Sequence, residues 1–151
     1  MHLVSLKDWS SSEVLETVNR ALEIKTSPQR FINALAGKAL ALLFQKTSTR
    51  TRCAGEIGMA QLGGHSVYLD WEMTNFILAD LRDEIRVLSS YTNLILARFL
   101  TYESVVVASD HSMVPVINGC CNQYHPTQAI GDLMTIKEKL GRLEGVKLTY
   151  V

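Results

Sequence analysis

Four short apolar segments alternate with segments of helical periodicity along this chain, and this alternation constrains the fold more than any other feature. The first segment, 38–44 (KALALLF), is almost continuously apolar, which is typical of a strand buried on both faces of a parallel sheet. Further strands are predicted at 65–69, 94–97 and 114–117. Strands that alternate with helices favour βαβ units with right-handed crossovers. We therefore expect an α/β fold, with a parallel central sheet of about four strands flanked by helices on both faces.

Capping residues and helix breakers mark the ends of the predicted helices. Ser10 and Glu13 have the spacing of a capping box, and Pro28 lies beyond the end of this first helix. Later helices are predicted at about 51–62 and 102–109, and from an apolar stripe at residues 78, 81, 85 and 88. The last helix follows residue 126, and Gly141 is well placed to end it.

Length and charge limit the classes of function. The 151 residues match one ordinary domain, which is large enough to bury a core. Fifteen basic and fifteen acidic residues give a formal net charge of zero, which argues against a broad basic surface for nucleic acid or anionic lipid. The longest apolar runs fall far short of the roughly 20 residues that cross a bilayer. We expect neither a nucleic acid nor a membrane as partner.

The three cysteines, Cys53, Cys120 and Cys121, fit neither a disulfide framework nor a metal site. Their number is odd, two of them are adjacent, and no Cys-x-x-Cys or histidine-rich spacing accompanies them. Residues 1–8 do not show the basic and apolar pattern of a secretory signal. We expect reduced thiols in the cytoplasm, no metal and no cofactor.

Polar residues follow the first predicted strand, at the edge of the sheet where open α/β folds bind ligands. Residues 45–52 (QKTSTRTR) lead directly into a helix, whose first N–H groups attract an anion. Hydroxyl groups and two arginines add donors at the same place. Because no Gly-x-x-x-x-Gly-Lys pattern is present, this segment is not a nucleotide P-loop.

Other polar residues follow the third and fourth predicted strands. Arg98 comes directly after the third strand, although such an arginine is by itself also typical of a strand at a sheet edge. His125 stands at a helix N-cap with Pro126 after it, a position that alone indicates a helix start more than a catalyst. Gln128, one turn along, is expected to point the same way as His125. Taken together, these residues indicate a site for a small phosphorylated molecule with a carbonyl group.

Two motifs resemble those of the aspartate/ornithine carbamoyltransferase family. Residues 48–52 (STRTR) closely resemble the family's Ser-Thr-Arg-Thr-Arg signature, and residues 125–128 (HPTQ) resemble its His-Pro-x-Gln motif. Arg98 stands where the family carries another phosphate-binding arginine. The similarity runs over nearly the whole chain from about Ser5.

The resemblance implies a role for each of these residues. The phosphate-binding residues would be Ser48, Thr49, Arg50 and Thr51. Arg98 would bind the phosphate and carbonyl oxygens, His125 would donate to the carbamoyl carbonyl oxygen, and Gln128 would accept from the carbamoyl NH2. These three residues would form the catalytic set for carbamoyl phosphate. Arg52 and Glu56 resemble a structural pair.

The resemblance also implies a division into domains. Residues 1–144 would form the carbamoyl-phosphate-binding domain, and residues 145–151 would begin the first strand of a second, amino-acid-binding domain. The full-length protein would be a homotrimer. Because the second domain normally binds the amine, we expect the chain by itself to be inactive.

The spacing between Gly119 and His125 resembles that of ornithine-type enzymes, which form citrulline and phosphate. Putrescine, aspartate or another amine remains an alternative acceptor. A non-catalytic paralogue that keeps the anion pocket for assembly is a further alternative.

One segment departs from the family pattern. The family's loop at 70–80 is usually glycine-rich and ends in Glu-Ser, whereas this chain has no glycine there and ends the loop in Ala79 and Asp80. Trp71 and Phe76 would then either contact a partner or the substrate, or pack on the helix that follows.

Overall fold

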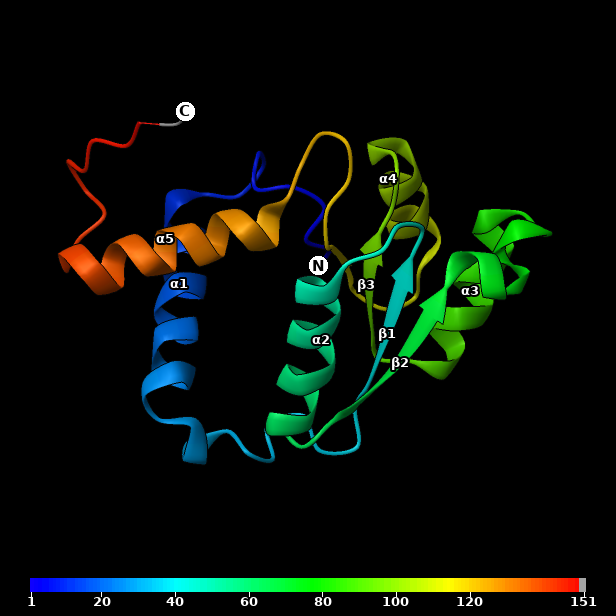
Figure 1. The fold of residues 1–151 in the computed structure, drawn as a ribbon, viewed down its shortest axis with the longest axis horizontal. Coiled ribbons are helices and arrows are strands. Elements are labelled where there is room, and N and C mark those ends of the chain that lie inside the picture. The colour runs from blue at the N-terminus through cyan, green and yellow to red at the C-terminus, as the bar shows by residue number, and fades with distance from the viewer. Residues whose placement is uncertain (150–151) are drawn as a thin grey trace.

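The computed structural model describes residues 1–149 and contains a parallel sheet with helices on both faces (Figure 1). The strands lie in the order β2-β1-β3-β4, and each neighbouring pair is parallel. This arrangement confirms the predicted α/β class. The strands are β1 (Ala39–Phe44), β2 (His65–Asp70), β3 (Leu94–Arg98) and β4 (Val116–Asn118).

The helices begin and end close to the residues that the sequence indicates. At the first helix, Ser10 Oγ accepts from the Glu13 amide at 3.3 Å, and the Ser10 amide donates to the Glu13 carboxylate at 2.7 Å. Gly141 ends the last helix with a φ of 71°, a left-handed conformation that suits glycine. The helices are α1 (Ser11–Thr26), α2 (Thr49–Gln61), α3 (Leu81–Tyr91), α4 (Tyr102–His111) and α5 (Pro126–Leu140). Three short turns of 3-10 helix are η1 (Pro28–Arg30), η2 (Trp71–Met73) and η3 (Asn75–Ile77).

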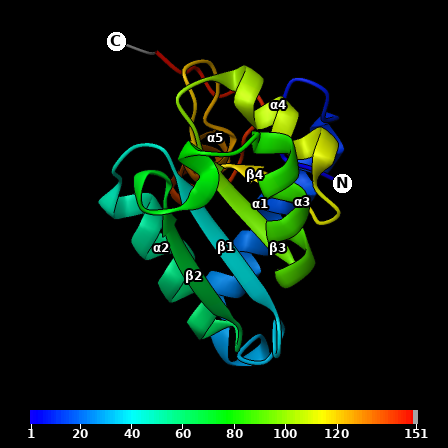
Figure 2. The ribbon, with the colours of Figure 1, turned by 90° about the vertical axis from the view of Figure 1, so that its right-hand side faces the viewer.

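The strand β1 is buried on both faces and divides the core into two layers (Figure 2). On one face, Ala41 and Leu43 pack with residues of α3 and α4. On the other face, Leu40 and Leu42 pack with Met59 of α2. Helices α1 and α5 lie on the α2 side of the sheet, where Lys25 pairs with Glu138 at 2.8 Å (Figure 1).

The N-terminal residues pair with the edge strand β4, a contact that the sequence pattern does not predict. The Leu3 amide donates to the Val116 carbonyl, and the Asn118 amide donates to the Leu3 carbonyl, each at 2.8 Å. The Val116 amide donates to Nδ1 of His2 at 3.1 Å. Residues 2–4 therefore cover the outer edge of β4.

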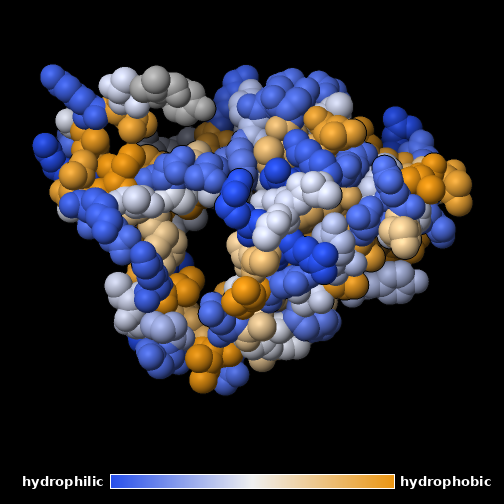
Figure 3. Space-filling model, in the orientation of Figure 1, coloured by the Kyte–Doolittle hydropathy of each residue, from blue (hydrophilic) through white to orange (hydrophobic). Residues whose placement is uncertain are grey.

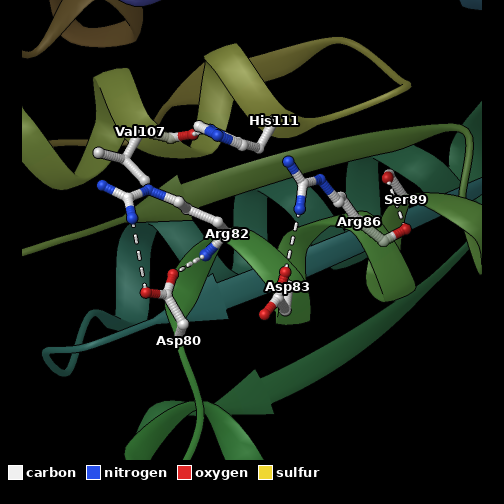
Figure 4. A network of polar contacts seen from close by, with 7 residues as sticks. All are labelled: Asp80, Arg82, Asp83, Arg86, Ser89, Val107 and His111. Atoms are coloured by element: carbon white, nitrogen blue, oxygen red, sulfur yellow. Dashed lines mark hydrogen bonds and ion pairs between the residues drawn. The ribbon is translucent and has the colours of Figure 1, made fainter.

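The structure corrects the predicted start of α3. Leu78 is not part of the buried stripe, because it lies outside the helix and is 82% exposed. Asp80 ends the preceding turn and caps α3, since its carboxylate accepts from the Arg82 amide at 2.8 Å (Figure 4). A side-chain cap at this position fixes the helix start after Leu78.

The expected strand at 145–151 is not found in the residues described. Residues 146–149 form no strand, because no neighbouring strand supplies hydrogen-bond partners to them within the described chain. The last two residues of the expected strand, 150 and 151, lie outside the described residues. Among the helices of residues 1–149, none is long and apolar enough to cross a membrane.

The helix α2 packs on β1 with a glycine facing the strand. A Cβ atom placed on Gly55 would lie 2.5 Å from Cδ2 of Leu42. This close approach places the N-terminus of α2 directly beyond the carboxyl end of β1. Gly58, one turn later, has nothing within 4 Å of the same position.

These two glycines give opposite predictions for alanine substitution. Gly55→Ala should lower the free energy of unfolding by about 1–3 kcal/mol, because the added methyl group overpacks the contact with Leu42. Gly58→Ala is the matched control and should raise it by up to about 1 kcal/mol, since alanine stabilises a helix interior relative to glycine. Urea unfolding of both variants measures the difference. Equal changes in the two variants would contradict the close packing of α2 on β1.

Candidate anion-binding site

A cleft of about 490 Å³ lies at the carboxyl ends of β1 and β3, between the N-termini of α2 and α5. It brings together six of the seven predicted site residues from three separate parts of the chain. Thr49 is the first residue of α2 but does not line the cleft. The lining residues are Ser48, Arg50, Thr51, Ala54, Gly55, Leu96, Arg98, His125, Thr127 and Gln128.

The segment after β1 forms the start of α2 as the sequence predicts. Ser48 has an extended backbone, and its Oγ accepts from the Thr51 amide at 3.3 Å, so it is the N-cap residue. The first N–H groups of a helix have no acceptor within the helix and carry partial positive charge. The Ser48 and Thr51 hydroxyls and the Arg50 guanidinium add side-chain donors to this helix end.

Arg98 connects the three segments of the cleft. It ends β3, which is an internal strand, so it is not a residue at the sheet edge. Its Nη1 donates to the Gly119 carbonyl at 3.2 Å and to Thr51 Oγ1 at 3.4 Å. Its Nε is buried, and no group of the described residues accepts a hydrogen bond from it. No carboxylate lines the cleft beside Arg98, so the charge of its guanidinium is available to attract an anion.

His125 lies at the start of α5 without capping it. Its backbone is not helical, and its Nδ1 lies 3.2 Å from Oγ1 of Thr127. Burial lowers the pKa of His125 below its ordinary value, and the nearby charges of Arg98 and Lys46 lower it further against an opposing effect of Asp132. The imidazole is therefore neutral at pH 7. If the Thr127 hydroxyl donates to Nδ1, the ring proton is on Nε2, which can then donate to a ligand.

Gln128 is oriented by a contact within α5. Its Nε2 donates to the Asp132 carboxylate at 2.8 Å. This contact identifies the other side-chain atom, Oε1, as an acceptor. The site therefore combines several donors with one amide acceptor, as a ligand with both an oxyanion and an NH2 group requires.

A second, larger cleft of about 770 Å³ lies between α1, α2 and α5 and has a different character. Figure 3 shows this opening between α1 and α2, with both hydrophobic and hydrophilic residues around it. Its one charged lining residue, Lys25, pairs with Glu138 at 2.8 Å. The smaller cleft has two arginines and no lining carboxylate, so it is the candidate site for an anion. Within residues 1–149, no group of three His, Cys, Asp or Glu side chains could hold a metal ion.

Two contacts of the site are missed by sequence reasoning. Thr127 holds the His125 ring, and the Gly119 carbonyl holds Arg98. Thr127 occupies the variable position of the His-Pro-x-Gln motif, so the motif gives no role for it. Arg52 lies outside the cleft, where it pairs with Glu56 at 2.9 Å and covers the ring of Tyr68 at 3.8 Å.

The atypical loop at 70–80 packs partly on its own domain. The Trp71 ring lies 5.1 Å from that of Phe76 and 5.7 Å from that of Phe99, and Phe76 is buried. These contacts favour the second interpretation of the loop, in which its aromatic residues pack inward. Met73 and Leu78 remain more than four-fifths exposed, at 85% and 82%.

Comparison with known families agrees with this geometry. The family domain described as the carbamoyl-P binding domain of aspartate/ornithine carbamoyltransferase matches residues 1–138. The chain belongs to this family. The match includes both motifs that form the cleft and Arg98 between them.

Named relatives include enzymes with two different acceptor specificities. The chain is 37% identical over 150 residues to an ornithine carbamoyltransferase of Listeria innocua, covering 99% of this chain and 48% of the relative. It superposes on ornithine carbamoyltransferase of Thermus thermophilus with a TM-score of 0.89 at 36% identity, covering 96% of this chain and 50% of that one. The catalytic subunit of M. jannaschii aspartate transcarbamoylase gives a TM-score of 0.86 at 36% identity, covering 96% of this chain and 49% of that one. The chain thus spans about half the length of these relatives.

The charge of Arg98 should have a measurable effect on the pKa of His125. In Arg98→Gln, the pKa of His125 should rise toward its ordinary value near 6.5, because a nearby cation that disfavours the imidazolium is removed. NMR titration of the imidazole signals measures this pKa. Arg82→Gln is the control, since Arg82 lies on α3 and pairs with Asp80 (Figure 4). An unchanged His125 pKa in Arg98→Gln would show that the two groups do not interact.

The same pKa shift predicts how stability depends on pH. The unfolded chain has a His125 pKa near 6.5, whereas the folded chain has a lower one, so the unfolded chain binds the proton more readily. The contribution of His125 to stability should be complete above about pH 6.5 and be lost as the pH falls through the folded-state pKa. Urea unfolding between pH 7.5 and 5, compared with His125→Gln, isolates this contribution. A contribution that instead grew on acidification would contradict the lowered pKa.

Proposed function

We propose that this chain is the carbamoyl-phosphate-binding part of a carbamoyltransferase. The observation that carries the proposal is the cleft formed by the family's two motifs, in which Arg50 and Arg98 meet without a lining carboxylate. Carbamoyl phosphate has a phosphate dianion at one end and a carbamoyl group at the other. Its chemistry matches a cleft with helix N–H groups and arginines for the phosphate, and a histidine and an amide for the carbamoyl group.

The phosphate is assigned to the α2 side of the cleft. Ser48, Thr49, Arg50 and Thr51 would bind it through the first-turn amides, hydroxyls and guanidinium group. Thr49 does not line the cleft with its side chain, so its contribution is assigned to its amide. The fork of the Arg98 guanidinium would bind a phosphate oxygen and the carbonyl oxygen together.

The carbamoyl group is assigned to the α5 side. His125 would donate from Nε2 to the carbonyl oxygen, and Gln128 Oε1 would accept from the NH2 group. When an amine attacks the carbonyl carbon, a C–N bond forms and negative charge develops on the carbonyl oxygen. The C–O bond to phosphate then breaks with its electron pair leaving on the phosphate oxygen, and the leaving phosphate takes up the proton from the amine nitrogen.

Fixed donors lower the barrier to this reaction. Arg98 and His125 are held by protein contacts before the substrate binds, so they need no reorganisation as charge develops on the oxygen. A single donor of this kind contributes about 2.7–4 kcal/mol in a protease oxyanion hole where it has been measured. A neutral histidine can fill this role, because its one protonated ring nitrogen donates a hydrogen bond.

We propose ornithine as the acceptor amine, with citrulline and phosphate as products. The support is the ornithine-type spacing between Gly119 and His125 and the names of the relatives. An aspartate transcarbamoylase subunit is also a structural neighbour, which keeps aspartate as the alternative. The acceptor would bind to a second domain of the full-length protein, which corresponds to the half of the relatives that this chain does not span.

We further propose that the full-length carbamoyltransferase is a cytoplasmic homotrimer. The family resemblance supports the trimer, and the unpaired cysteines of the described chain are consistent with a reducing compartment. Sedimentation of the full-length protein at micromolar concentration tests the trimer. A monomer under those conditions would contradict it.

Arg98 should be needed for binding. Calorimetry should detect binding of inorganic phosphate and of carbamoyl phosphate to the wild-type chain. Arg98→Gln should lower the affinity for each ligand by about tenfold or more, because a hydrogen bond to a charged group contributes roughly 1.5–3 kcal/mol. Arg82→Gln removes an arginine of the same charge outside the cleft and should leave both affinities unchanged. A folded wild-type chain that binds neither ligand at millimolar concentration would falsify the proposed function.

The chain alone should not form citrulline. With carbamoyl phosphate and ornithine, citrulline formation should not exceed the uncatalysed background. The reason is that the residues that bind the amine are assigned to a second domain, in the half of the relatives that this chain does not span. A colorimetric citrulline assay measures the product. Sustained turnover that Arg98→Gln abolishes would show that the amine site lies within this chain.

A further inference from the structure

The turn between β4 and α5 contains a strained residue beside the candidate site. Cys120 has a φ of 144°, and it is the one non-glycine residue in the described part of the chain with a positive φ. A side chain rarely adopts this region, which persists only where surrounding contacts hold it. The neighbouring Gly119 carbonyl is the group that accepts from Arg98 Nη1. The strain therefore lies next to the carbonyl that holds the anion-binding arginine.

Asn118 supplies contacts that hold this turn. Its side chain is completely buried and uses both ends of its amide. Its Oδ1 accepts from the Cys120 amide at 3.0 Å. Its Nδ2 donates to the Val4 carbonyl at 2.9 Å and to Cys121 Sγ at 3.4 Å. Asn118 thus connects the N-terminal segment, the strained residue and the following cysteine.

Cys121 holds the second half of the turn. It is 7% exposed, and its Sγ accepts from the Tyr124 amide at 3.3 Å. Its own amide donates to the Tyr124 carbonyl at 3.0 Å. These bonds close residues 121–124 into a tight turn that ends directly before His125.

Gly119 lies between the two groups of contacts, and both its backbone and the space beside it are engaged by β3. Its amide donates to the Ala97 carbonyl at 2.7 Å, and a Cβ atom on it would lie 2.5 Å from Leu96 Cδ2. With Asn118 fixed on one side and Cys120 on the other, the direction of the Gly119 carbonyl is determined. The Gly119 carbonyl is therefore a held acceptor for Arg98 Nη1, which also donates to Thr51 Oγ1.

We propose that Asn118 and Cys121 are positioning residues for the anion site. Neither lines the cleft, and both act through the Gly119 carbonyl on the Arg98 guanidinium. The consequence for ligand affinity rests on the proposed function, whereas the effect on Arg98 itself does not. A turn that served stability alone would leave Arg98 unaffected when its contacts were removed.

The test compares Cys121→Ala with Cys121→Ser in the whole 151-residue chain. Alanine removes the acceptor for Asn118 Nδ2 and the Tyr124 amide, whereas a serine hydroxyl retains an acceptor and a donor. Cys53→Ala is the control, because Cys53 is an exposed thiol on α2 outside this turn. Three quantities are measured: hydrogen exchange of Arg98 Nε–H by NMR, phosphate affinity by calorimetry, and the free energy of unfolding.

Cys121→Ala should speed the exchange of Arg98 Nε–H at least fivefold and weaken phosphate binding about three- to tenfold. Cys121→Ser should stay within twofold of the wild type in both, and Cys53→Ala should change neither. A Cys121→Ala variant that loses stability while Arg98 exchange stays unchanged would overturn the positioning role. If the wild-type chain does not bind phosphate, the proposed function fails, but the exchange of Arg98 Nε–H still decides the role of Cys121.

Discussion

The burial of β1 on both faces is the constraint on which the rest of the structure depends. A strand with apolar side chains on both sides needs a layer of helices on each face, and parallel crossovers provide these layers. The same pairing places Phe44 opposite Arg98. The segment after β1 therefore begins beside Arg98, at the same edge of the sheet. The core thus determines where the groups of the candidate anion site meet.

Arg98 shows how local charge differs from net charge. The chain is neutral overall, but the cleft contains two arginines and no lining carboxylate. The guanidinium is held by a carbonyl and a hydroxyl, neither of which neutralises it. Its charge therefore remains available to a ligand, and it also lowers the pKa of the neighbouring His125. A carboxylate partner would have stabilised the arginine but removed its attraction for an anion.

The fold and the candidate site could be predicted from the sequence where local patterns determine the structure. They could not be predicted where contacts between distant residues determine it. The apolar run at 38–44 predicted the central strand, and the polar residues after the strands predicted the cleft. Leu78 was assigned wrongly because its spacing fits the α3 stripe, while the cap formed by Asp80 ends the helix before it. The contacts of Asn118 could not be predicted, since its partner Val4 is 114 residues away and no periodicity links them.

The pairing of residues 2–4 with β4 has a consequence for the order of events during synthesis. Val4 and Asn118 are 114 residues apart, so residues 2–4 can pair with β4 only after the intervening chain has been synthesised. At about 5–20 residues per second, the synthesis of these 114 residues takes roughly 6–23 s. During that time β1, β2 and α2 can form, but the turn beside Arg98 cannot take its final shape. The anion site is therefore among the last features of the nascent domain to be completed.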